Sequence, residues 1–111
     1  MVDFCVFPNH LVTLMPDYLW WVSVMPNCVG SFKATWGVAV QQEILNDIAE
    51  EDYERWVKEK KDYIDTANEE DKVLVERLFQ GSQSVRVPQG TYHPIEKNLW
   101  QFTKYISKIT A

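Results

Sequence analysis

The chain has 111 residues, a formal net charge of −5 at pH 7, and 46% hydrophobic and 14% aromatic residues. This length and composition are typical of one globular domain with one core. The acids are concentrated between Glu43 and Glu76, and no basic surface for a nucleic acid is expected. No apolar run approaches the roughly 20 residues that cross a bilayer, so we also expect no membrane segment.

The chain contains two cysteines, Cys5 and Cys28, and neither belongs to a CxxC motif or a Cys/His cluster. A zinc or iron–sulfur site built from this chain alone is therefore not expected. No secretory signal favours a disulfide, so we expect buried free thiols and a cytoplasmic protein.

Hydrophobic alternation predicts an antiparallel meander of three or four strands over about residues 4–40. Pro-Asn and Pro-Asp pairs separate the apolar runs and are typical turn signals. The clearest strand is expected at residues 31–40, where Phe32, Ala34, Trp36 and Val38 share one face.

The periodicity then changes to that of helices, which are expected at about residues 50–64, 68–83 and 94–109. In the last of these, Ile95, Leu99, Phe102 and Ile106 form an apolar stripe behind Pro94. Strands followed by helices predict an α+β fold, with an antiparallel sheet packed on a long C-terminal helix. The sheet is small for this much helix, so we expect an incomplete domain.

An unusual acid lies in the segment of residues 68–84. On a helical wheel Asp71 falls near the middle of an apolar arc that contains Leu74, Val75, Leu78 and Phe79. A carboxylate on a core-facing stripe is costly unless it is paired, hydrogen-bonded or bound to a metal.

A structural alternative explains the same acid. The segments Thr66–Glu69 and Asn68–Asp71 both have the form of a capping box. If Asn68 caps a helix, Asp71 is a first-turn acid that the helix dipole stabilises, and a solvated charge near a helix start is equally ordinary. The wheel and the capping pattern leave both interpretations open.

Other chemistry finds little support in the sequence. It contains no Ser/His/Asp signature, no GxSxG and no phosphate-binding glycine-rich loop, so no catalytic residue is assigned. His10 follows a Pro-Asn turn and His93 precedes a proline. We interpret both as loop histidines and not as metal ligands.

Several short motifs follow one another along nearly the whole chain: Phe7-Pro8-Asn9, Leu14-Met15-Pro16-Asp17, Glu70-Asp71 with Val75-Glu76, Gly81 with Ser84, and Gly90 with Glu96, Trp100 and Phe102. Their order and spacing resemble the C-terminal end of the catalytic alpha subunit of Rieske-type non-haem iron oxygenases, which hydroxylate aromatic rings. The resemblance implies a helix-grip fold, in which a curved antiparallel sheet wraps a long C-terminal helix.

The resemblance also implies a mononuclear iron held by two histidines and one carboxylate, with positions left open for dioxygen. The Glu70-Asp71 step matches the family motif, which implies that Asp71 is the iron ligand. Leu74, Val75 and Leu78 are then candidates for the lining of the substrate pocket.

The chain departs from the family because it lacks the Rieske cluster motif and histidines at the matching positions. The resemblance therefore implies a C-terminal fragment, inactive alone, of a parent with a 2Fe-2S cluster in its N-terminal part. The parent would be a homo-oligomer, a trimer, that takes electrons from a reductase or ferredoxin. It would use dioxygen to hydroxylate or demethylate a small organic substrate. The alternative is a non-catalytic helix-grip module that binds a small hydrophobic ligand or a partner protein.

Overall fold

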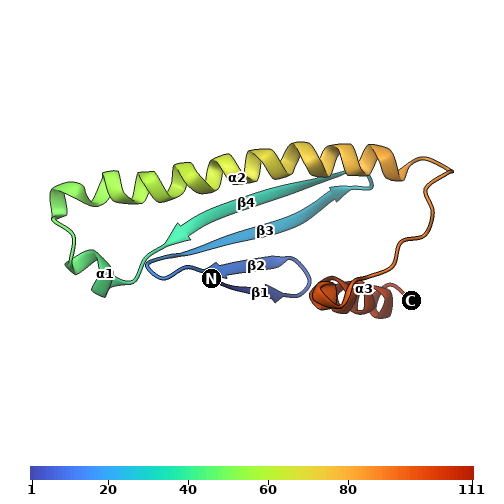
Figure 1. Cartoon of the computed structure of the whole chain (residues 1–111), viewed down its shortest axis with the longest axis horizontal. Coiled ribbons are helices and arrows are strands. Elements are labelled where there is room, and N and C mark those ends of the chain that lie inside the picture. The colour runs from blue at the N-terminus through green and yellow to red at the C-terminus, as the bar shows by residue number, and fades with distance from the viewer.

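A computed structural model describes all 111 residues and contains one four-stranded antiparallel sheet (Figure 1). The strands are β1 (Val2–Val6), β2 (His10–Leu14), β3 (Leu19–Cys28) and β4 (Ser31–Ala39), and they lie side by side in chain order. The α+β class and the four-stranded meander predicted from the alternation are confirmed. None of the helices has the combination of length and apolar character needed to cross a membrane.

The helices follow the sheet in the chain. They are α1 (Gln42–Asn46), α2 (Tyr53–Ser82) and α3 (Lys97–Ile109), with single 3-10 turns at Glu50–Asp52 and Pro94–Glu96. The 30-residue helix α2 runs along β4 (Figure 1), and the shorter α3 lies at one end of the β1–β2 hairpin.

The helix break expected between residues 64 and 68 is wrong, because α2 passes through this segment without interruption. No glycine or proline occurs between Tyr53 and Gln80, so nothing in the backbone chemistry stops the helix. The Thr66 hydroxyl donates to the carbonyl oxygen of Asp62 at 2.9 Å, a bond made inside a helix and not at its start.

The start of α3 follows its sequence signal closely. The backbone N–H of His93 donates to Glu96 Oε2 at 2.6 Å, and Ile95 N–H donates to His93 Nδ1 at 3.3 Å. These two bonds form a capping box with Pro94 in the first turn. His93 is therefore a helix cap, which agrees with its interpretation as a loop histidine.

Aromatic contacts hold α3 to the hairpin. The Phe7 ring, in the β1–β2 turn, lies 5.8 Å from the Phe102 ring and 5.4 Å from the Tyr105 ring, measured between centroids. Such aromatic pairs contribute about 0.5–1.5 kcal/mol beyond the area they bury. Of the apolar stripe predicted for this helix, Phe102 contacts the β1–β2 turn, whereas Ile95 and Leu99 are exposed.

The strand register separates the two faces of the sheet. Trp36 pairs with Val22, and Leu11 pairs with the same valine from the other side, so these three side chains share one face. Trp36 bonds to α2, which identifies this as the helix-covered face. The opposite face carries Phe4 and Val6, and both are exposed.

Little of the molecule is buried. Tyr18 and Ile64 are the two buried residues, and the accessible surface is 9278 Å². A globular monomer of 13.0 kDa would expose about 6,300 Å², so the excess is about 2,900 Å². The chain therefore leaves apolar faces of both the sheet and α2 uncovered.

Both cysteines are free, as expected. Cys5 is half-buried in β1, whereas Cys28 at the end of β3 is exposed. The expectation of burial is therefore wrong for Cys28, which is the last residue of β3, next to the β3–β4 turn.

Candidate functional site

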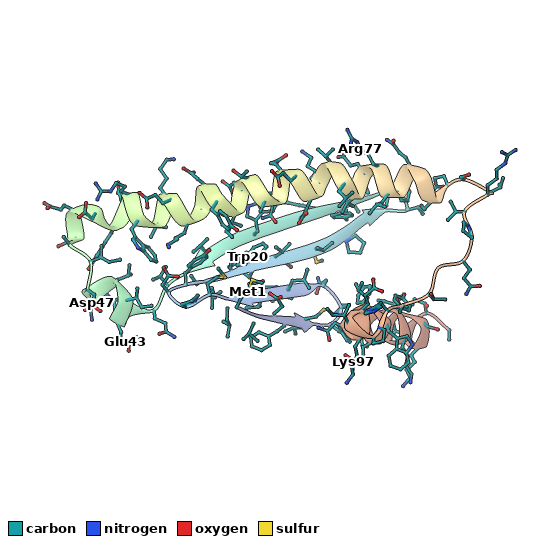
Figure 2. All side chains as sticks on the ribbon, viewed as in Figure 1. Met1, Trp20, Glu43, Asp47, Arg77 and Lys97 are labelled. Carbon is teal, nitrogen blue, oxygen red and sulfur yellow. The ribbon has the colours of Figure 1, made fainter.

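The side of α2 that faces the sheet is identified by Ile64, whose side chain is 1% exposed. Asp71 lies seven residues further on, which in an α-helix is about 20° from an exact two-turn repeat and about 10 Å along the axis. The Asp71 side chain therefore leaves the helix on nearly the same side as Ile64. Figure 2 shows Arg77 on the opposite side of α2, away from the sheet.

The Asp71 carboxylate is exposed and makes no hydrogen bond or ion pair with any residue of the chain. The nearest basic residue in sequence, Lys72, is paired instead with Glu69 at 3.3 Å. An acid at this position is thus free to bind a cation or a donor brought by another part of a larger protein.

Asp71 is surrounded by uncovered apolar side chains. Leu74, Val75 and Leu78 are 55%, 42% and 63% exposed, and with Asp71 they span an arc of about 100° on the wheel. We call these four residues the Asp71 face. The structure places the three candidate pocket residues beside the candidate ligand, on an open face.

The capping alternative for Asp71 is wrong. Asn68 lies inside α2, and the residue at the helix N-terminus is Asp52. Asp71 is therefore an interior helix residue without the stabilisation of a first-turn acid. The amide nitrogen Nδ2 of Asn68, one turn earlier, is buried and has no hydrogen-bond partner.

One polar contact joins α2 to the central part of β4. The Trp36 indole N–H donates to Asp65 Oδ1 at 2.8 Å, and the Lys61 ammonium pairs with the other carboxylate oxygen. The Lys61 ammonium and then the Trp36 indole hold the pKa of the Asp65 carboxyl below its usual range.

A second contact joins α2 to the β2–β3 turn. Lys60 Nζ lies 2.8 Å from Asp17 Oδ2 and sits over the rings of Tyr18 and Trp56, at 5.2 Å and 4.9 Å from their centroids. Burial raises the pKa of the Tyr18 phenol, and the nearby Lys60 ammonium opposes this rise.

The pattern of the sequence did not predict Lys60, Asp65 or Asp17 as contact residues. One signal was available for Asp65. Trp36 lies on the apolar face of an alternating strand, and a covered indole N–H needs an acceptor. An acid on the covering helix is the natural candidate.

The two histidines lie away from α2. His10 is the first residue of β2 and not a loop residue, and its ring stacks on Trp21 with a centroid distance of 5.7 Å. His93 caps the turn before α3. No three His, Cys, Asp or Glu side chains gather where they could hold a metal ion. The residues of this chain therefore do not by themselves fit the two-histidine, one-carboxylate iron site that the resemblance implies.

A shallow hollow of about 200 Å³ lies over β1, β2 and β3. It is lined by Asp3, Phe4, Leu11, Val12, Thr13, Trp20 and Val22. Pockets for small ligands typically have volumes of about 300–1,000 Å³. The hollow is thus too small to be a complete ligand pocket.

Comparison with known proteins gives one positive result. No curated protein and no solved structure shows significant similarity to the chain. The family model described as the ring hydroxylating alpha subunit (catalytic domain) matches residues 1–111. This chain therefore belongs to the family of ring-hydroxylating alpha subunits and carries sequence of their catalytic domain.

Proposed function

We propose that the chain forms the C-terminal part of a Rieske non-haem iron oxygenase catalytic domain and contributes Asp71 as the carboxylate ligand of its mononuclear iron. One observation carries this proposal. Asp71 lies on the sheet side of α2, among uncovered apolar side chains, and has no partner within the chain. Family membership supplies the context in which that position has a function.

The chain exposes about 2,900 Å² more surface than a globular monomer of its mass, and the Asp71 face is part of that surface. Once another part of the protein covers this face, an unpaired carboxylate there would cost several kcal/mol. A bound cation removes this cost, because it supplies the missing opposite charge.

The remaining ligands must come from residues outside this chain. Two histidines together with Asp71 would give the facial arrangement that leaves metal positions open for dioxygen. Leu74, Val75 and Leu78 would then form an apolar wall beside a small organic substrate that is hydroxylated or demethylated. This wall would favour apolar substrate atoms and exclude water from that side.

The 2Fe-2S cluster would be carried by an N-terminal part of the parent protein, and electrons would come from a reductase or ferredoxin. The parent would be a cytoplasmic homo-oligomer, a trimer. The alternative is a non-catalytic module that binds a small hydrophobic ligand or a partner protein, and the match to a catalytic-domain family favours the oxygenase over it.

The test compares iron content in the assembled oxygenase that contains this chain. Asp71→Ala is expected to lose most of its mononuclear iron, measured by mass spectrometry per protomer. The matched control is Glu70→Ala, which removes the adjacent acid about 100° round the helix and is expected to retain iron. Unchanged iron in Asp71→Ala would overturn the assignment.

A further inference from the structure

Helix α2 is held to the sheet at a few points, and most of them precede Asp71. Ile64 is buried against the sheet, Lys60 pairs with Asp17, and Asp65 accepts from Trp36. From residue 69 to the end of the helix every side chain is exposed. The part of the helix that carries Asp71 thus projects beyond its firmest contacts.

One apolar contact lies on the far side of Asp71. Atoms of the Phe79 ring lie 3.7–3.8 Å from where a Cβ would stand on Gly30, in the β3–β4 turn. Phe79 is itself exposed, and apolar contacts are not directional. This contact can therefore limit how far α2 lifts from the sheet, but it does not fix the rotation of the helix.

We propose that the Trp36–Asp65 hydrogen bond is a positioning contact that sets the rotation and register of α2 and so keeps Asp71 on the sheet side. The functional meaning of this contact rests on the proposed role of Asp71. The geometric claim is independent of iron.

The direction of the bond supports this assignment. Asp65 lies about 120° round the helix from Asp71 and about 100° from Ile64. The burial of Ile64 holds the helix towards the sheet, while the indole of Trp36 holds it from the side. If α2 slid along the sheet by one turn, about 5 Å, this 2.8 Å hydrogen bond would be lost. Apolar contacts between the helix and the sheet tolerate such a slide more easily, because they are not directional.

The second polar contact defines the axis of the helix. Lys60 is anchored at the β2–β3 turn through Asp17, whereas Asp65 is anchored on β4 through Trp36. Two anchors on different parts of the sheet set a direction, and the rest of α2 follows it because a helix is stiff over this length. The position of Asp71 is then a consequence of contacts made one to three turns earlier.

The test measures the position of residue 71 directly in the full chain. Spin labels are placed at Asp71→Cys and Lys33→Cys in a background with Cys5→Ser and Cys28→Ser. Pulsed electron paramagnetic resonance gives the distance distribution between them. The parent background is expected to show one population, and Trp36→Phe to add a second one displaced by about 5 Å, one helical turn.

Matched variants separate positioning from general damage. Asp65→Leu is expected to behave like Trp36→Phe, whereas Asp65→Asn keeps an acceptor oxygen and should retain the single population. Trp100→Phe is the control tryptophan, because its indole lies on α3 and makes no hydrogen bond to α2. Circular dichroism checks helix content, and if Trp36→Phe unfolds, the Asp65→Asn and Asp65→Leu pair decides.

A single unchanged population in both Trp36→Phe and Asp65→Leu would overturn the proposal. This failure is distinguishable from failure of the iron assignment. If Asp71→Ala retained its iron, the iron assignment would fail but the measured label distances would still stand. If the label distances did not change, the positioning role of Trp36–Asp65 would fail but the iron measurement would still stand.

Discussion

Replacement of Ile64 by alanine is the most informative test of how α2 is attached. Ile64 is the one fully buried side chain, and it lies on the sheet-facing side of α2, next in the chain to the two polar anchors Lys60 and Asp65. Ile64→Ala removes three carbons, at about 0.8 kcal/mol each, and leaves a cavity that adds to the loss. We expect unfolding free energy to fall by about 3 kcal/mol, within the usual range of about 2–5 kcal/mol for this substitution.

The assay is urea unfolding at 25 °C, followed by circular dichroism and tryptophan fluorescence. Ile64→Val should cost about 1 kcal/mol, and Ile95→Ala, at a side chain that is 85% exposed, should stay within about 0.5 kcal/mol. An Ile64→Ala loss no larger than that of Ile95→Ala would refute the reasoning. It would show that α2 does not depend on this packing.

Three further outcomes are expected. Gly37→Ala should destabilise the chain by about 1–3 kcal/mol in urea unfolding, because its Cβ would stand 2.9 Å from the indole ring of Trp21. Gly81→Ala is the matched control: a Cβ there meets open space, so this variant should stabilise the chain by about 0.5–1 kcal/mol. Alkylation followed by mass spectrometry should label Cys28 before Cys5. A hydrogen bond with Ser31 lowers the pKa of the exposed Cys28 thiol, whereas burial raises the pKa of the Cys5 thiol. Equal labelling rates would contradict this. The lowered pKa of Asp65 stabilises the folded state above pH about 4, the ordinary carboxyl range, and this contribution is lost as the pH falls through the folded-state pKa. In a pH series of unfolding curves, the unfolding free energy of Asp65→Asn should therefore fall less steeply at acid pH than that of the parent chain.

The sheet was predictable because its signals are local. Strict alternation around Trp36 and proline-containing turns after Phe7 and Met15 specify strands within a few residues. The Asp71 face was also predictable, because a helical wheel needs only the 3.6-residue period. These features depend on neighbours in sequence and not on how distant parts of the chain meet.

The continuity of α2 was not predicted, because the capping-box patterns at Thr66–Glu69 and Asn68–Asp71 favour a helix start in this segment. These patterns are weak without a glycine or proline before them, and the uninterrupted run of helix-forming residues prevailed. The Trp36–Asp65 contact could not be found from periodicity either. It joins residues 29 positions apart and depends on how the helix is placed on the sheet.

Strand β1 has a consequence for the handling of this chain. It is one of the two edge strands of the sheet, so one row of its backbone N–H and C=O groups has no neighbouring strand, and Val2, Phe4 and Val6 beside them are exposed. The single charged side chain in the strand, Asp3, accepts a hydrogen bond from Thr13 at 2.8 Å. Edge strands usually carry free charges that deter pairing with other chains. The β1 edge lacks that protection, so at high concentration it can support intermolecular sheet growth and aggregation.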